Sequence, residues 1–384
     1  MHSHKEIGIL AFVPERWQAY WMPRHHIISR LARYYKVLWV SPPLGWREAI
    51  RNKYTPRGIT KISSSFWTYA PERYLPIISP SYFGPLSYFL DAMRVRKIKS
   101  LLNEMCITRL ILYLWRPEYA CYVGNFKEEL LCYHIDDEYK FSKIDQSISE
   151  EESQLLKDSH IVFIHSKTLL EKKGKFNTST YYVPNGVDFD HYRNAVEDEK
   201  THLCELDSIP KPRIGYAGYI KSQIDLKLLL GIARERKDWS LVLVGPINKS
   251  QQKIQKDIEL LRREGNVHFL GGKKPKDLPK YIKEMDVCLM CYNKTAYTNH
   301  IYPMKLHEYL ACGRPVVSTC LENLKDFQHV LYFAEGLEDW IENIQRCLEE
   351  QNAELRQKRI AVARENSWDA RVEEIRSIFQ QKLD

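Results

Sequence analysis

The sequence predicts an α/β protein with two doubly wound, Rossmann-like domains in tandem. Its 384 residues exceed what one hydrophobic core usually serves. Short apolar runs, typical of strands buried on both faces, alternate with helical patterns through most of the chain. Because parallel strands need crossover connections, this alternation indicates parallel sheets covered by helices.

The second half of the chain shows the alternation most regularly. Helical patterns at 224–236 and 249–265 separate apolar runs there. The strands expected in this half are 213–218, 240–246, 266–272, 286–292, 314–319 and 329–335. In the first half, the expected strands are 7–13, 36–42, 109–115, 130–136, 161–166 and 180–186.

The join between the domains is expected in a charged, weakly periodic stretch that Pro210 and Pro212 close. After the last strand the pattern is helical, and the final helix has enough apolar positions to pack elsewhere. The expected division is a first domain at 1–190, a linker at 191–210, a second domain at 211–365, and a helix at 366–384 that packs back on the first domain.

The composition limits which kinds of partner and which cellular compartment are expected. A net charge of +8 favours an anionic partner: a nucleotide, a nucleic acid or an anionic membrane face. No nucleic-acid-binding motif is recognised, so nucleic acid is not expected. Nine scattered cysteines suit reduced thiols, and Cys288 and Cys291 have no second pair with which to hold zinc. The apolar stretch near the amino terminus is too short to span a membrane and lacks a signal cleavage site, which favours a cytoplasmic protein.

The run "PMKLHEYLACGRPVV" at 303–317 places Lys305 and Glu308 one helical turn apart after a polar loop. Pro303 is expected at the first helical position, so Lys305 would lie in the first turn, where an ammonium and free amides suit a diphosphate. Glu308 shares this face, and its carboxylate can accept hydrogen bonds from two sugar hydroxyls. Phosphate beside ribose indicates a nucleotide. The alternative is an ordinary helical ion pair on a solvated face.

Ligands of open parallel sheets bind beyond the carboxyl ends of the strands. The strand "RIGYA" ends at such a point, where Gly218 lets the backbone approach a phosphate closely and Lys221 follows in the turn. The alternative is a purely structural turn from strand to helix.

The strand that contains His134 is followed by Asp136 and Asp137. Adjacent carboxylates at a strand end can accept the proton of an attacking hydroxyl or hold that hydroxyl in place. The alternative is a pair of aspartates that cap a helix.

A stretch at 81–100 combines aromatic and apolar residues with a basic cluster. A helix of this composition is suited to an anionic membrane interface. The residues expected to dock there are Phe83, Phe89, Arg94, Arg96 and Lys97. The alternative is an amphipathic helix that faces the core and has a solvated basic end.

Together, "PMKLHEYLACGRPVV", "YYVPNGVDFDHY", "IGYAGYI" and "ENSW" resemble the retaining nucleotide-sugar glycosyltransferases of family four, which have the GT-B fold. Two other stretches, "WMPRHHIISRLARYYKVLWVSPP" and "CYHIDDEYKF", are similar to the subgroup that assembles bacterial cell-wall and exopolysaccharide chains. That subgroup includes teichuronic-acid transferases and, more distantly, the xanthan glucuronosyltransferase. The resemblance implies two Rossmann-like domains that face a cleft.

Carried over by position, the resemblance implies that Glu308 binds the donor's ribose, Lys305 its diphosphate, and the turn from Gly215 to Gly218 the phosphate region. His300 stands where the family usually has a second glutamate that contacts the donor sugar. The complete donor-binding set is Gly215, Gly218, Lys221, Gly271, Asn299, His300, Lys305 and Glu308, and the catalytic set is His134, Asp136, Asp137 and Lys305.

These observations predict a retaining, metal-independent glycosyltransferase that moves a sugar from a nucleoside diphosphate sugar, such as a UDP-sugar, to a saccharide acceptor. No further cofactor is expected, because lysine and helix-terminal amides can neutralise the leaving diphosphate. The acceptor is expected to be lipid-linked and the enzyme to be peripheral on the inner membrane face, in cell-surface polysaccharide assembly. The alternatives are a sugar-nucleotide epimerase of similar architecture and a non-catalytic scaffold of the same fold.

Overall fold

The computed structural model describes residues 7–17, 21–51, 57–77, 80–137, 148–198, 202–248 and 250–384, except the side chains of 80–83. The chain forms two compact units. The first unit consists of Met1–Pro184 with Val372–Asp384, and the second of Asn185–Arg371.

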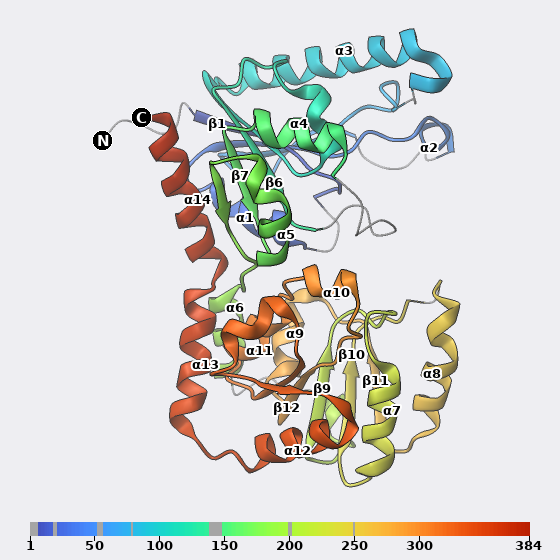
Figure 1. The fold of residues 1–384 in the computed structure, drawn as a ribbon. Coiled ribbons are helices and arrows are strands. Elements are labelled where there is room, and N and C mark those ends of the chain that lie inside the picture. Colours follow the sequence, from blue (N-terminus) through green and yellow to red (C-terminus); the bar gives the residue numbers. More distant parts are fainter. Residues whose placement is uncertain are drawn as a thin grey trace. The chain divides into compact units, whose positions relative to one another are not determined.

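The first unit is built on an eight-stranded sheet in the order β3-β4-β2-β1-β5-β6-β7-β8 (Figure 1). The strands are β1 Ile7–Phe12, β2 Lys36–Val40, β3 Gly58–Lys61, β4 Phe66–Ala70, β5 Arg109–Leu114, β6 Leu130–Ile135, β7 Ile161–Ile164 and β8 Thr180–Tyr182. The edge pair β3 and β4 is antiparallel, and every other pair in this sheet is parallel. All six expected strands of the first half are therefore present, and the expectation missed β3 and β4.

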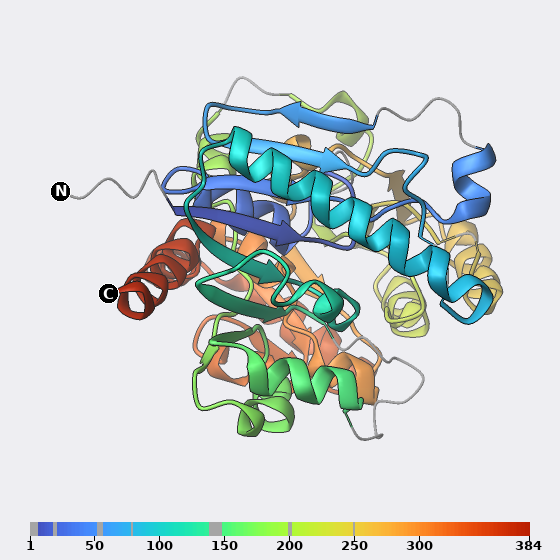
Figure 2. The ribbon, with the colours of Figure 1, turned by 90° about the horizontal axis from the view of Figure 1, so that it is seen from above.

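Helices cover both faces of this sheet, which explains why its central strands read as continuous apolar runs. The helices are α1 Pro23–Leu31, α2 Trp46–Arg51, α3 Pro80–Glu104, α4 Glu150–Asp158 and α5 Lys167–Lys173. The described residues of this unit also include two short 3₁₀ segments, Pro117–Tyr122 and Gly174–Phe176. Figure 2 shows α3 running across one face of the sheet, where Ile98 and Leu101 pack against the strands. Among the described residues, no helix is both long and apolar enough to cross a membrane.

The second unit has a six-stranded, fully parallel sheet in the order β11-β10-β9-β12-β13-β14. The strands are β9 Arg213–Ala217, β10 Ser240–Val244, β11 Val267–Gly271, β12 Val287–Met290, β13 Val316–Thr319 and β14 Tyr332–Ala334. Its helices are α6 Phe189–Glu197, α7 Leu226–Glu235, α8 Gln252–Arg263, α9 Leu278–Ile282, α10 Ala296–His300, α11 Lys305–Ala311, α12 Gly336–Glu349 and α13 Ala353–Glu365. Short 3₁₀ segments lie at Cys204–Leu206, Pro275–Asp277 and Glu322–Phe327. All six expected strands of this half are present.

The expected linker at 191–210 is a correction. Its described residues belong to the second unit, because Tyr192, Leu206 and Ile209 are buried in the core of that unit. The charged residues on the exposed side of α6 make its sequence resemble a linker, so its buried face was not predicted. The second unit begins at Asn185, not at 211.

The last helix, α14 Trp368–Leu383, changes unit within its first turn. From Val372 onward it belongs to the first unit. There the ring of Phe379 lies 6.0 Å from that of Tyr113 and 5.9 Å from that of Phe163. Apolar positions on this helix are therefore buried against the first sheet.

Candidate functional site

Three glycines lie together at the carboxyl ends of neighbouring strands in the second unit. Gly218 follows β9, Gly245 follows β10, and Gly271 ends β11. The Gly218 N–H donates to the carbonyl of Val244 at 2.8 Å, and the Gly245 N–H donates to that of Gly271 at 2.9 Å. Their φ angles are +144°, +154° and +70°, which side chains rarely tolerate. This set, the glycine edge, keeps the ends of three strands free of side chains.

The expectation named Gly218 and Gly271 but missed Gly245. A Cβ at Gly245 would overlap the carbonyl oxygen of Gly218, so no larger residue fits there. The signal was available, because "LVLVGP" ends an apolar run in glycine as "RIGYAG" does.

Lys305 lies directly against this edge. A Cβ at Gly218 would overlap the Lys305 Cε atom and lie 2.6 Å from its Nζ. The ammonium is 5.5 Å from the centre of the Tyr216 ring. Burial lowers the pKa of Lys305, and the nearby Glu308 partly opposes that shift. Within the described part of the chain, no hydrogen bond or ion pair reaches this ammonium. A partly buried cation of this kind is a ready site for an anionic ligand.

Glu308 follows on the same helix and has a different environment. Burial raises the pKa of Glu308, while Lys305 and a hydrogen bond from Tyr192 of α6 lower it. Although both residues are described, no ion pair within 4.0 Å joins Glu308 to Lys305. The alternative of an ordinary helical ion pair is therefore not what the structure shows.

The helix that carries both residues is shorter than expected. It begins at Lys305, not at Pro303, and Met304 occupies its N-cap. The hydroxyl of Tyr309 accepts from the Ala217 N–H at 2.9 Å and donates to the Ala217 carbonyl at 3.3 Å. Because Ala217 is the last residue of β9, this pair of bonds fixes α11 to the glycine edge.

Asn299 and His300 lie in α10, a short helix in the connection that leads to α11. The side-chain amide of Asn323 donates to the carbonyls of Asn299 and Ile301 at 3.0 and 3.1 Å. The loop backbone is therefore held in place, with the Asn299 side chain exposed and His300 partly buried.

Two further donor candidates occupy different places. Gly215 is a correction, because it lies inside β9, where a Cβ would stand 2.6 Å from the Met285 sulfur. Because Gly215 has no side chain, α9 and the turn that follows it can pack closely on the sheet. Gly215 does not belong to the turn that follows β9. Lys221 lies partly buried in the turn after Gly218, and its carbonyl accepts from the N–H of Ile224 at 2.9 Å.

His134 of the first unit is a correction. It is 1% exposed, and its ring stacks on that of Trp115 with the centres 4.1 Å apart. Its Nδ1 lies 2.7 Å from the Tyr113 hydroxyl. Burial holds the pKa of His134 well below its usual value, so the ring stays neutral. It is a core histidine that no substrate can reach in this arrangement.

Asp136 and Asp137 differ although they are adjacent. The Asp136 carboxylate is 3% exposed and ion-paired with Arg24 of α1. Arg24 also bonds Glu15 at 2.5 Å, and burial raises the pKa of Glu15. Asp136 is therefore part of a buried charge network that ties α1 to the end of β6, a role that the sequence did not reveal. Asp137 is partly exposed and stays the candidate base.

The expected membrane-docking set is divided by the structure. Arg94 is a correction: it is 2% exposed, donates to the carbonyls of Leu75 and Pro76 at 3.1 and 2.7 Å, and pairs with Asp91. Arg96 and Lys97 are exposed, and Phe89 is 60% exposed. The side chain of Phe83 lies outside the described residues.

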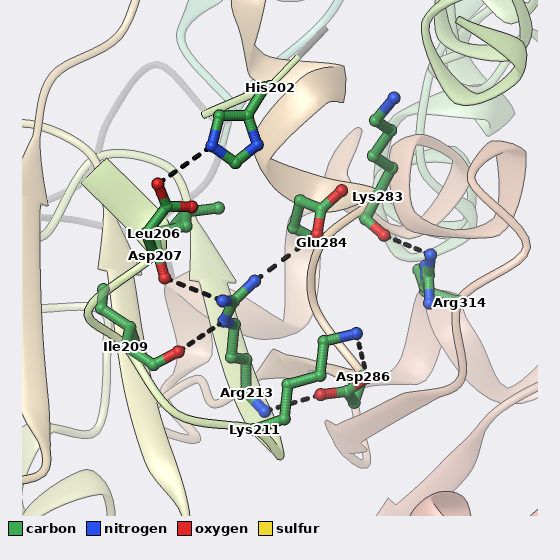
Figure 3. A network of polar contacts seen from close by, with 10 residues as sticks. All are labelled: His202, Leu206, Asp207, Ile209, Lys211, Arg213, Lys283, Glu284, Asp286 and Arg314. Carbon is green, nitrogen blue, oxygen red and sulfur yellow. Dashed lines mark hydrogen bonds and ion pairs between the residues drawn. The ribbon is translucent and has the colours of Figure 1, made fainter. Parts of the chain in front are cut away.

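Possible metal ligands lie elsewhere. In the part of the chain that the structure describes, His202, Cys204 and Asp207 place ligand atoms within 4.8 Å of one another, and all three are exposed. Figure 3 shows His202 bonded to Asp207, with Nε2 and Oδ2 2.9 Å apart. This group precedes β9, whereas the glycine edge follows it. All nine cysteines are free thiols, and burial raises the pKa of Cys291 to about 12.

Two units with doubly wound sheets, one of them ending in a glycine edge beside a lysine, define the GT-B architecture of glycosyltransferases. Solved structures support this fold assignment. Their sequence identities to this chain are low, so the likeness concerns the fold alone. The sucrose-phosphate synthase of Thermosynechococcus elongatus superposes with a TM-score of 0.69 at 14% identity, over 97% of this chain and 98% of that one. HepE of Anabaena, solved in complex with UDP, gives 0.70 at 15% identity, over 98% of this chain and 100% of that one. The expected fold class is confirmed.

The sequence comparisons identify the second unit more closely. Residues 211–350 match the family described as glycosyl transferases group 1. TuaH of Bacillus subtilis (strain 168), provisionally described as a teichuronic acid biosynthesis glycosyltransferase, is 30% identical over 194 residues. That match covers 49% of this chain and 47% of TuaH, so it spans about half of each protein. The expected resemblance to this group of enzymes is confirmed.

Proposed function

We propose that the protein is a glycosyltransferase that moves a sugar from a nucleoside diphosphate sugar to a saccharide acceptor. One observation carries the proposal: the Lys305 ammonium has no anionic partner among the described residues and lies against Gly218 at the glycine edge. A diphosphate can approach there because no side chains project from the strand ends. The ammonium then stabilises the negative charge that grows on the diphosphate as the glycosidic bond to the sugar breaks.

Glu308 would hold the ribose of the same nucleotide. Tyr192 lowers the pKa of this carboxylate, which has acceptor positions for two hydroxyl donors. Tyr309 fixes the helix that carries both Lys305 and Glu308 to β9. One turn of one helix would thus present Lys305 to the diphosphate and Glu308 to the ribose.

UDP is the nucleotide that we propose. HepE, whose fold this chain shares, was solved in complex with UDP and with UDP-glucose. The similarity to TuaH, described as acting in teichuronic acid biosynthesis, supports a role in polysaccharide assembly, and we propose a lipid-linked saccharide as acceptor. On the acceptor side, Asp137 is the carboxylate that we propose as base, since it is partly exposed whereas the Asp136 side chain is 3% exposed.

Transfer is proposed to retain the configuration of the donor sugar and to need no metal. The positive charge of Lys305 takes the place that a divalent cation has in other transferases. His300 stands near Lys305 in the sequence, on the loop that Asn323 holds, and a ring nitrogen there can bond a sugar hydroxyl.

The direct test is an activity assay with purified protein. A panel of UDP-sugars is supplied with and without a lipid-linked saccharide acceptor, and release of UDP is measured. The proposal predicts release that increases with the acceptor and disappears in Lys305→Ala. Interconversion of the UDP-sugar without acceptor dependence would indicate the epimerase alternative. Tight UDP binding with neither reaction would indicate a non-catalytic protein.

A further inference from the structure

A cavity lies where strands of the second sheet begin. A cavity of about 830 Å³ is lined by Pro212, Trp239 and Pro315, which directly precede β9, β10 and β13. We call it the strand-start pocket. The glycine edge and Lys305 lie at the other ends of the same strands, so the two sites share no residues. All residues that line the pocket belong to the second unit.

Charged side chains dominate its walls. The basic members are Lys211, Arg236, Arg314, Arg356 and Arg359, and the acidic members are Asp238, Asp286 and Glu350. Three ion pairs use all three acids: Arg236 with Asp238 at 2.7 Å, Lys211 with Asp286 at 3.6 Å, and Arg359 with Glu350 at 2.5 Å. Arg314 and Arg356 are left over, and within the described residues neither has a carboxylate partner.

These two arginines share one wall of the pocket. The Arg356 side chain packs on Gly313, where a Cβ would lie 3.0 Å from its Cγ and 3.1 Å from its Nε. Gly313 directly precedes Arg314 in the chain. Both side chains line the pocket, and neither of their positive charges is balanced by a carboxylate of the described residues, which favours an anion there.

Arg314 has limited support from the protein itself. Its Nη2 donates to the carbonyl of Lys283, as Figure 3 shows, and its Nε is buried without an acceptor. A guanidinium offers five N–H donors, so most of its capacity is unused. Arg356 is exposed and carries no side-chain hydrogen bond in the described structure.

One other feature of the pocket favours a negative ligand. The amino terminus of α13, a helix of 13 residues, contributes Asn352 and Ala353 to the lining. The positive end of a helix dipole adds to the field of the two arginines.

We propose that the strand-start pocket binds a small ligand that carries an oxyanion, either phosphate or carboxylate, between Arg314 and Arg356. Its volume is in the range of small-molecule sites. Since the pocket shares no residue with the glycine edge, its ligand binds at a site separate from that of the donor substrate. The inference does not depend on the proposed transfer reaction.

Calorimetric titration at low salt tests the site. Pyrophosphate probes the phosphate arm and citrate the carboxylate arm. The variants are Arg356→Gln, which changes an exposed side chain, the double variant Arg314→Gln/Arg356→Gln, and the control Arg263→Gln, an exposed arginine of α8. The wild type and the control should bind at least one probe, and the double variant should lose about tenfold or more in affinity. Arg356→Gln alone should fall between them.

Because pyrophosphate can also enter the glycine edge, Lys305→Ala is titrated in parallel. Binding that persists in Lys305→Ala and is lost in the arginine variants places the anion in the strand-start pocket. Binding that is lost in Lys305→Ala and unchanged in the arginine variants would overturn the inference while leaving the proposed function intact. Absence of binding by either probe to the wild type would overturn it as well. Circular dichroism of each variant confirms that the fold is retained.

Discussion

Lys305 and Glu308 lie one turn apart, yet their environments assign them different tasks. Glu308→Gln keeps the size of the side chain but weakens hydrogen bonds to ribose hydroxyls. Because a hydrogen bond to a charged group is worth about 1.5 to 3 kcal/mol, UDP affinity should fall roughly tenfold to a hundredfold. Lys305→Ala should also lower kcat, since the charge it removes matters most as the diphosphate departs. Steady-state kinetics with both variants make the comparison, and equal effects on KM alone would contradict separate roles.

The lowered pKa of Lys305 predicts a pH dependence of UDP binding. Burial disfavours the ammonium, so Lys305 loses its proton at a lower pH than it does in the unfolded chain. Between those two pKa values the unfolded state binds more protons, and this group therefore favours folding more as pH rises. Binding changes in the opposite sense, because the diphosphate requires the ammonium. As pH rises, UDP affinity should therefore decline at a lower pH than the titration of an ordinary lysine would give.

Lys305→Arg is the matched control for that titration. Arginine keeps its charge throughout the range, so the decline should move to higher pH or vanish. An unchanged profile would mean that another group is responsible.

At the scale of elements, the sequence predicted every strand of the two sheets except the antiparallel pair β3 and β4. Buried strands such as 240–244 are short, continuous apolar runs, and such runs are typical of strands covered on both faces. The strand Gly58–Lys61 is exposed at the sheet edge and has no such run, so its sequence carries little signal. Similarly, the sequence placed Arg94 in a basic cluster, but only its contacts with Leu75 and Pro76 show that it faces inward.

The helix α3 keeps a surface suited to membrane docking after this correction. Leu86, Tyr88 and Phe89 are 44%, 72% and 60% exposed, and Arg96 and Lys97 are exposed about two to three turns later. Phe89 and Arg96 are seven residues apart and so share a face of the helix. We expect the apolar end to enter the interface while the basic end contacts anionic headgroups.

Replacement of Arg96 and Lys97 by glutamate should release the protein from vesicles of phosphatidylserine and phosphatidylcholine. About 1 kcal/mol is expected for each basic residue removed, and more for charge reversal. Sedimentation with vesicles measures this, and the double variant Lys253→Glu/Lys256→Glu on α8, which makes the same change in net charge, is the control. Unchanged vesicle binding would return this face of α3 to an ordinary solvated surface.

At the scale of the whole molecule, the sequence motifs predicted the two sheets and the GT-B class, but not the boundary between the units. The second unit begins at Asn185 and includes the buried apolar residues of α6, although the charges of 191–210 resemble those of a linker. In the candidate site, too, some features were predicted from the sequence and others were not. Lys305 and Gly218 were predicted because glycine and charge are visible in a sequence. The burial of His134 and the pairing of Asp136 were not, since their partners Trp115 and Arg24 are distant in the chain.

Metal independence is a prediction about the complete enzyme. EDTA should leave sugar transfer unchanged, because Lys305 supplies the charge beside the diphosphate. The cluster of His202, Cys204 and Asp207 offers a separate place for a metal ion, so chelation is repeated with Cys204→Ser. Loss of transfer on chelation in both proteins, with recovery on adding Mg²⁺ or Mn²⁺, would assign the charge to a metal and remove it from Lys305.

The central claim is that Lys305 and Glu308 together hold a nucleoside diphosphate at the glycine edge. Its most direct test is calorimetric titration of UDP into the double variant Lys305→Ala/Glu308→Gln, with Lys256→Ala as the exposed-lysine control. We predict that UDP binds the wild type and the control alike, while affinity for the double variant falls at least a hundredfold. A double variant that is folded and still binds UDP with the affinity of the wild type would contradict the account.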